Sequence, residues 1–153
     1  MAGKSTKYDA LKLENEVSFP LYAASKEIIH RYKPHLDALG LTYTQYLAML
    51  VLWEDDELSV NQMGARLYLD SGTLTPLLKK LEAKGLITRE RSQADERRVY
   101  VKLTDSGKQL RAKAAGVPAA VKEELEFDAE DERLLSMTFN WLLERLVGDQ
   151  EDE

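Results

Sequence analysis

The sequence contains no cysteine and only two histidines, His30 and His35. Without cysteine the chain has neither a thiol nucleophile nor a thiolate ligand for a metal ion. A metal site would have to combine the histidines with carboxylates such as Glu27 or Asp37, and ordinary surface histidines on a helix explain the pattern better. Glycine-rich phosphate-binding loops are missing too. We therefore expect the chain not to be an enzyme and to hold no metal and no cofactor.

Long hydrophobic runs are absent as well. No apolar stretch approaches the roughly 20 residues that a membrane-spanning helix needs, and the first residues, MAGKSTKYDALKLENE, lack the apolar core of a secretory signal. The 153 residues are 44% hydrophobic and 31% charged, which suits one domain with a sizeable core. We expect a cytoplasmic protein with no membrane partner.

Positive charge is scarce overall, because the net charge is −6. The charges are unevenly distributed, however. Nine Lys and Arg against six Asp and Glu give residues 57–103 a net charge of +3, so the rest of the chain carries −9. A basic segment on an acidic body can orient a protein toward phosphates, although an uneven solvated surface would give the same count.

The N-terminal part of the sequence predicts helices. Apolar residues recur at helical spacing over residues 10–32, and Pro20 indicates a helix start near Ser18 or a bend in its first turns. Residues 34–39 predict a separate short helix, which Gly40 ends.

A capping box then begins the most apolar helix of the chain. Thr42 is followed three residues later by Gln45, the spacing at which the two residues cap a helix start together. The helix that follows, residues 43–53, is apolar nearly all round. We expect it to be buried at the centre of the fold.

Residues 58–108 predict a winged helix-turn-helix, a module that places one helix in the major groove of DNA. Ser59 caps a first short helix, and Asp70 or Ser71 begins a second one. Two segments with alternating apolar residues are predicted strands around a polar hairpin loop, SQADERR: residues 86–91 and 99–103.

The C-terminal part predicts more helices. Thr104 caps a long helix that Gly116 and Pro118 should kink, and a final helix over about 129–147 is rich in Leu, Phe and Trp. So much apolar surface indicates a homodimer, although the terminal helices could instead bury their faces within one chain.

The predicted fold class is therefore mostly α with a small β-wing, in two functional regions. Residues 41–103 would form the winged helix-turn-helix DNA-binding module. Residues 1–40 and 104–153 would form a helical dimerisation region.

Candidate DNA-binding residues lie on the second helix of the pair and on the wing. Small hydroxyl side chains at the helix start can bond backbone amides or reach phosphates and base edges, and lysines further along suit phosphates. On the wing, an arginine at the hairpin tip can enter a narrow minor groove, while an aspartate can hold the loop or orient Arg97. The helix candidates are Ser71, Thr73, Thr75, Lys79, Lys80 and Lys84, and the wing candidates are Arg91, Asp95, Arg97 and Arg98. Ordinary capping and a solvated turn remain the alternative for each residue taken alone.

Two runs of this sequence resemble known regulators. One run resembles the MarR family of bacterial transcription regulators: DSGTLTPLLKKLEAKGLITRERSQADERRVYVKLTDSGK. A second run resembles the organic-hydroperoxide-resistance (OhrR) subfamily of that family: LENEVSFPLYAASKEIIHRYKPHLDALGLTYTQYLAMLVLWE. The resemblance covers about residues 10–147. It implies a homodimeric repressor on a near-palindromic double-stranded DNA operator, which leaves DNA when an organic peroxide oxidises a cysteine in the first helix.

The sequence departs from that subfamily at the decisive residue, because Ser18 occupies the position of the sensing cysteine. The resemblance matches Tyr22, Tyr32 and Tyr43 to the tyrosines that surround the sensing thiol in relatives. A hydroxyl cannot undergo sulfur oxidation, so organic peroxide is not expected to act on this chain. Two explanations stay open: a deliberate Cys→Ser substitution that holds the reduced-like, DNA-binding state, or a natural regulator that responds to a bound ligand. For the function of the whole chain, a winged-helix protein-interaction module is an alternative to a DNA-binding repressor, and it would lack salt-dependent duplex binding.

Overall fold

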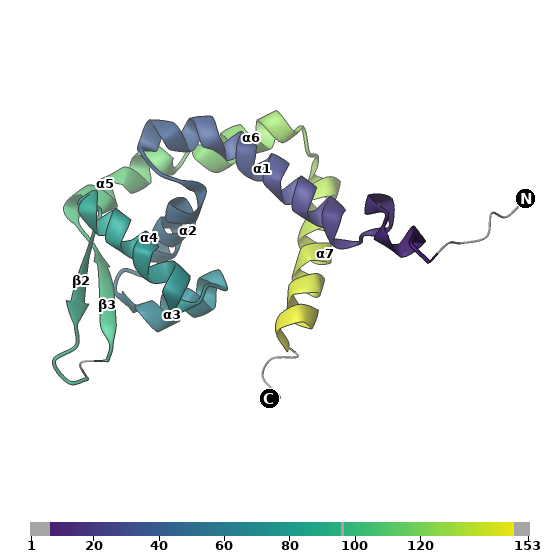
Figure 1. Ribbon diagram of the computed structural model, residues 1–153. Coiled ribbons are helices and arrows are strands. Elements are labelled where there is room, and N and C mark those ends of the chain that lie inside the picture. Colours follow the sequence, from purple (N-terminus) through teal and green to yellow (C-terminus); the bar gives the residue numbers. More distant parts are fainter. Residues whose placement is uncertain (1–6, 96, 149–153) are drawn as a thin grey trace, which may run out of the picture. The chain divides into compact units, whose positions relative to one another are not determined.

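A computed structural model of the chain describes residues 7–95 and 97–148. Two compact units are distinguished, Met1–Val117 and Pro118–Glu153. The chain is mostly helical with one small sheet, as predicted (Figure 1). The helices are α1 (Ser18–Leu39), α2 (Tyr43–Glu54), α3 (Val60–Leu67), α4 (Ser71–Ala83), α5 (Asp105–Ala114), α6 (Val117–Leu125) and α7 (Ala129–Gly148), and the strands are β1 (Leu58–Ser59), β2 (Ile87–Arg91) and β3 (Val99–Leu103).

Helix α1 is one uninterrupted helix, so the prediction of a separate short helix that begins at Pro34 is wrong. Proline inside a helix removes one backbone hydrogen bond but leaves the remaining ladder in place. Packing holds both flanks of Pro34: the Tyr32 ring lies edge-on to the ring of Tyr43, with centroids 5.1 Å apart, and Leu36 is fully buried. Gly40, at φ 68°, ends the helix as predicted.

Helix α2 is the centre of the first unit, as its apolar sequence predicted. It packs against α1, α3, α4, α5 and strand β3. The predicted capping box is present, since Thr42 Oγ1 accepts the Gln45 N–H and Gln45 Oε1 accepts the Thr42 N–H. Its buried apolar side chains are Tyr46, Ala48, Met49, Val51, Leu52 and Trp53.

Helices α3 and α4 form the predicted pair. The side chains of Ser59 and Asp70 cap their N-termini. The turn between them is tight, because a Cβ on Gly64 would lie 2.7 Å from the carbonyl oxygen of Leu69. The inner face of α4 is fully apolar and buried, with Leu74, Leu77, Leu78 and Leu81.

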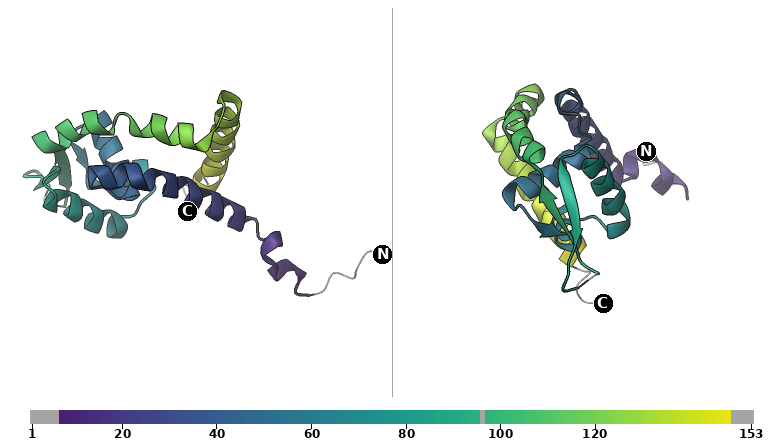
Figure 2. Two further views of the ribbon diagram at one scale, coloured as in Figure 1. Left: turned by 90° about the horizontal axis from the view of Figure 1, so that it is seen from above. Right: turned by 90° about the vertical axis from the view of Figure 1, so that its left-hand side faces the viewer.

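The sheet has the strand order β1-β3-β2, and both pairs are antiparallel. Strands β2 and β3 match the two predicted strands, with Ile87 opposite Leu103 and Arg91 opposite Val99. The sequence did not predict β1, which has only two residues. Figures 1 and 2 show that the β2–β3 hairpin projects away from α3 and α4, as a wing does.

The predicted long helix after Thr104 is divided into α5 and α6, which are separated at residues 115–116. The kink expected at Gly116 and Pro118 is therefore a complete break. The Thr104 side chain caps α5 as predicted, since its Oγ1 accepts the Gly107 N–H at 3.1 Å.

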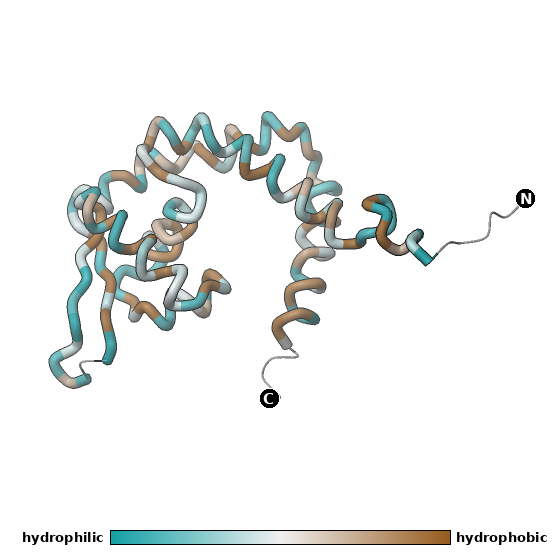
Figure 3. The backbone as a smooth tube through the Cα atoms, viewed as in Figure 1, coloured by the Kyte–Doolittle hydropathy of each residue, from teal (hydrophilic) through white to brown (hydrophobic). Residues whose placement is uncertain are grey.

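The second unit consists mainly of α7, whose N-terminus is capped by Asp128. Its Oδ1 accepts the N–H groups of Glu130 and Asp131, both at 2.8 Å. Apolar residues recur along the whole helix (Figure 3). Its exposed large apolar side chains are Leu134, Met137, Trp141, Leu143, Leu146 and Val147. No helix in the described part of the chain is long and apolar enough to cross a membrane.

The boundary between the compact units differs from the predicted functional division. Residues 18–39 of α1 and the whole of α5 belong to the same unit as the winged module. The predicted division into a dimerisation region and a DNA-binding module is one of function. The compact units of a single chain do not test it. It stays a prediction.

The approach of α5 to the start of β2 gives a first testable prediction. A Cβ on Gly107 would lie 2.1 Å from the carbonyl oxygen of Leu86, and this backbone atom cannot move without shifting the hairpin. We expect Gly107→Ala to lower the free energy of unfolding by about 1–3 kcal/mol, the usual cost of overpacking. Urea unfolding at fixed protein concentration measures the change.

Gly116→Ala is the matched control, since a Cβ on Gly116 meets no atom within 4 Å. It should leave the free energy of unfolding unchanged or raise it slightly, because alanine restricts the unfolded chain. Equal destabilisation by both substitutions would contradict the close approach at Gly107.

Candidate nucleic-acid interface

A groove of about 740 Å³ lies between helix α4 and the β2–β3 hairpin. Five cationic side chains line it, and no carboxylate is among its described lining residues. The cations are Lys79, Arg89, Arg91, Arg97 and Arg98, and the uncharged polar residues are Ser59, Asn61, Gln62, Ser71, Thr75 and Tyr100. Such a surface suits a polyanion that offers hydrogen-bond acceptors as well as charge.

Helix α4 supplies one wall of the groove. Ser71, Thr75 and Lys79 follow one another at intervals of four residues, which places them on one helix face. The cap turns Thr73 in another direction, because its hydroxyl donates to Asp70 Oδ2 at 3.1 Å. Hydrogen bonds from the backbone N–H and the hydroxyl of Thr73 lower the pKa of Asp70, so the cap is ionised at neutral pH.

The β2–β3 hairpin supplies the other wall, and hydrogen bonds within its loop hold the loop in shape. Ser92 Oγ accepts the N–H groups of Ala94 and Asp95, at 3.2 and 3.3 Å. Asp95 in turn accepts the backbone N–H of Arg97 at 3.1 Å and pairs with the guanidinium of Arg98 at 3.5 Å. Asp95 therefore holds the loop, which is one of its two predicted roles. Its side chain pairs with the guanidinium of Arg98 and not with that of Arg97.

An ion pair joins the two walls. Glu82 of α4 accepts two hydrogen bonds from the Arg89 guanidinium of β2, at 2.6 and 3.0 Å, and one from the Arg89 backbone N–H at 3.2 Å. The guanidinium is the main reason why the pKa of Glu82 is lowered. Among the cations that line the groove, Arg89 therefore makes the shortest contacts with a carboxylate, that of Glu82.

Four of the predicted DNA-binding residues lie outside the lining of the groove: Thr73, Lys80, Lys84 and Asp95. Lys84 is furthest from its predicted role. It lies at the C-terminal end of α4, where its ammonium donates to the carbonyl oxygen of Gly40 and to Gln45 Oε1. The structure therefore supports a bracing contact for Lys84 and gives no support to phosphate binding.

The sequence interpretation missed several lining residues, chiefly Asn61, Gln62, Arg89 and Tyr100. Arg89 had a signal, because side chains two residues apart on a strand share a face and Arg91 was already a candidate. The others are brought to the groove by the packing of α3 and β3, which no local pattern announces.

The predicted sensor residues are not gathered in one place within the chain. Helix α1 begins at Ser18, whose hydroxyl donates to the carboxylate of Glu16 at 2.9 Å. Ser18 is exposed, and Tyr22, one turn later, is 65% exposed. Tyr32 lies about 21 Å from Ser18 along the helix axis, at 1.5 Å per residue.

Tyr32 and Tyr43 do lie together, and Tyr46 joins them with ring centroids 5.9 and 6.5 Å away. Burial, and then the neighbouring Tyr32, raises the pKa of Tyr43. Its phenol is therefore protonated at neutral pH and can donate a hydrogen bond. The sequence interpretation missed Tyr46.

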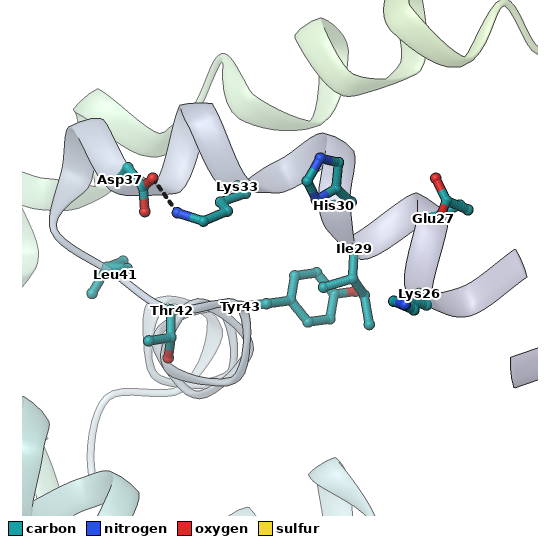
Figure 4. A pocket seen from close by; sticks show the side chains of 9 residues that line it. All are labelled: Lys26, Glu27, Ile29, His30, Lys33, Asp37, Leu41, Thr42 and Tyr43. Atoms are coloured by element: carbon teal, nitrogen blue, oxygen red, sulfur yellow. Dashed lines mark hydrogen bonds and ion pairs between the residues drawn. The ribbon is translucent and has the colours of Figure 1, made fainter. Parts of the chain in front are cut away.

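A second cavity, of about 620 Å³, lies between α1 and the start of α2, beside this tyrosine cluster (Figure 4). Lys33 and Asp37 form an ion pair on its α1 wall. The lining from α1 is Lys26, Glu27, Ile29, His30, Lys33 and Asp37, and the other wall is Leu41, Thr42 and Tyr43. No group of three or more His, Asp or Glu in the described part of the chain could hold a metal ion.

Comparisons with known proteins agree with this geometry. The family described as "Transcriptional regulator SarA/Rot" matches residues 30–113. The organic hydroperoxide resistance transcriptional regulator of Bacillus subtilis is 50% identical over 140 residues, which cover 92% of this chain and 95% of that protein. The HTH-type transcriptional regulator SarZ of Staphylococcus saprophyticus is 41% identical and covers 78% of this chain and 82% of its own length.

Solved structures extend the similarity to the fold. Reduced AbfR bound to DNA, a protein of Staphylococcus epidermidis, superposes with a TM-score of 0.72 at 33% identity and covers 93% of this chain and 99% of its own. The Bacillus subtilis and Staphylococcus saprophyticus relatives are named transcriptional regulators and not enzymes, as the sequence predicted. The chain therefore belongs to the winged-helix transcription regulators of the MarR/SarA type, and within them to the group of the organic-hydroperoxide-resistance regulators.

Proposed function

We propose that this chain is a dimeric repressor that binds a near-palindromic DNA operator in the bacterial cytoplasm, and that Ser18 makes it unresponsive to organic peroxides. The observation that carries the proposal is the groove between α4 and the hairpin, with five cations and no carboxylate among its described lining residues. A module built only to bind proteins would not need this concentration of one charge. The relative AbfR is described as bound to DNA, which supports the same use of the fold.

Each wall of the groove suits a different part of the duplex. The start of α4 carries Ser71 and Thr75, whose hydroxyls can donate to base edges or phosphates in a major groove wide enough for a helix. Arg97, exposed at the hairpin tip, suits the minor groove next to it. Lys79 and Arg91, between these two, suit phosphates.

A second copy of the chain is part of the proposal because of the apolar surface that one chain leaves exposed. On α7, Leu134, Met137 and Trp141 share one face, and they are 63%, 61% and 57% exposed. At the start of α1, Val17 and Tyr22 are 89% and 65% exposed. Soluble proteins rarely leave such surfaces uncovered, and two-fold symmetry matches a palindromic operator.

The same dimer would complete the peroxide-sensing site of relatives. Within one chain Ser18 is far along α1 from the paired rings of Tyr32 and Tyr43. Only another copy could bring those rings to residue 18. The phenols could stabilise a thiolate there, but a serine hydroxyl offers no thiolate for oxidation.

A ligand-responsive regulator that naturally lacks the redox cysteine is the second candidate function. The cavity beside Tyr43 favours it, because about 620 Å³ lies within the usual range of small-molecule pockets. In that case a small molecule would release the unmodified chain from DNA, and residue 18 would have no part in the response.

The proposed dimer can be tested by sedimentation. The unmodified chain should sediment as a dimer at micromolar concentration, and Trp141→Glu should raise the dissociation constant at least about 100-fold, because it would bury an unpaired carboxylate. Gln109→Glu on the exposed side of α5 adds the same charge and should have no effect. A monomeric unmodified chain would contradict the dimer.

The wing can be tested by operator binding, with a duplex that the unmodified chain selects from a random library. Arg97→Ala should weaken binding by about 1–3 kcal/mol per half-site, the cost of one lost base-pair contact. Arg111→Ala, an exposed arginine of α5, should change binding little. Equal affinities would remove the wing from the mechanism, and binding without salt dependence would favour the protein-interaction module.

Ser18→Cys tests the sensing position. A thiolate there can attack a peroxide: an S–O bond forms, the O–O bond breaks, and the alcohol leaves with a proton. We expect this variant to leave the operator when organic hydroperoxide is added, while the unmodified chain stays bound. Mobility shift combined with mass spectrometry of residue 18 measures both events. A variant that is fully oxidised yet still bound would contradict the sensing role.

A further inference from the structure

The ion pair between Glu82 and Arg89 combines three contacts in one place. Glu82 Oε2 accepts Nη2 and Nε of Arg89 at 2.6 and 3.0 Å, and Oε1 accepts the Arg89 backbone N–H at 3.2 Å. The two side chains are only 37% and 22% exposed, so water screens the pair less than it screens a surface salt bridge. A bidentate guanidinium contact of this kind also fixes orientation.

The backbone contact has a structural reason. In the order β1-β3-β2, strand β2 lies at the edge of the sheet. The N–H of Arg89 points to that open edge, where no further strand accepts it, and the carboxylate of α4 accepts it instead. Glu82 therefore bonds both the side chain and the main chain of the wing strand.

The position of Glu82 is unexpected on electrostatic grounds. Its spacing of three residues from Lys79 places it on the same side of α4 as Ser71, Thr75 and Lys79, although it is not itself among the lining residues of the groove. A carboxylate beside a phosphate-binding surface would weaken binding unless a cation neutralised it. Arg89 lines the same groove, yet its guanidinium is directed to Glu82.

We propose that Arg89 is a positioning residue that does not bind phosphate, and that its pairing with Glu82 sets the spacing between the recognition helix α4 and the wing. This inference rests on the proposed DNA-binding function. Specific binding requires α4 and the wing to engage neighbouring grooves at the same time, so it depends on that spacing. Non-specific binding depends on phosphate contacts alone and does not.

The experiment compares Glu82→Gln with Glu90→Gln, which removes an exposed carboxylate from the same hairpin. Binding is measured with the selected duplex and with a random duplex of equal length, over a range of salt concentrations. Glu82→Gln should weaken binding of the selected duplex about tenfold, although it removes a negative charge near DNA. Its affinity for random duplex and its salt slope should stay the same. Glu90→Gln should not weaken either duplex.

Arg89 variants complete the test. Arg89→Gln should match Glu82→Gln, the double variant should be no worse than either, and Arg89→Lys should recover part of the loss. Tighter or unchanged binding by Glu82→Gln would overturn the proposal. So would a salt slope that falls by about 0.9 per lost contact in Arg89→Gln, since Arg89 would then bind phosphate.

Spin labels measure the spacing without DNA, and the absence of native cysteine makes the labelling specific. Cysteines would replace Ala83 at the end of α4 and Ala94 in the hairpin loop, both exposed, with labelled chains diluted in unlabelled ones. We expect the distance distribution to become about twofold broader in Glu82→Gln. An unchanged distance distribution in Glu82→Gln would overturn the proposal, whether or not the unmodified chain binds DNA. Failure of the unmodified chain to bind DNA would refute only the proposed function.

Discussion

Burial of the apolar helix α2 is the interaction on which the rest of the first unit depends. Each large side chain that it buries stabilises the fold by about 1.5–3 kcal/mol, and the helix contacts α1, α3, α4, α5 and β3 together. The Trp53 indole N–H, which donates to the Gly107 carbonyl oxygen at 2.9 Å, ties this core to α5. Helix α4 and strand β3 of the wing therefore both pack on one buried element.

Polar contacts refine that geometry at its outer edge. Asp70 caps the start of α4, Lys84 braces its end against the α1–α2 corner, and Glu82 joins it to the wing strand. Three charged residues at the ends of one helix therefore serve to position it. Other cations of the groove, such as Lys79 and Arg97, are not used in these contacts, and the proposed function assigns them to DNA. This division explains how a chain of net charge −6 can present a basic surface.

Two exposed apolar surfaces of the chain lie outside the winged helix-turn-helix. Apolar side chains stay exposed at the start of α1 and along α7, and the tyrosine cluster lies far along α1 from residue 18. The proposed insensitivity to organic peroxides rests on residue 18 being a serine and not a cysteine. Here the hydroxyl of Ser18 bonds the carboxylate of Glu16, an arrangement without redox chemistry.

The sequence by itself determined the helices with strong caps, the winged module and the family, because caps such as Thr42 with Gln45, apolar periodicity and the DSGTLTP and DERR motifs are local signals. It misjudged Pro34, since packing on both flanks keeps α1 continuous, and it missed the two-residue strand β1. Only the tertiary structure decided that Lys84 braces α4 and that Arg89 of β2 pairs with Glu82 of α4. These outcomes depend on contacts between residues that are far apart in sequence or on different elements, and no pattern along one element encodes which side chain an acid or a lysine will meet.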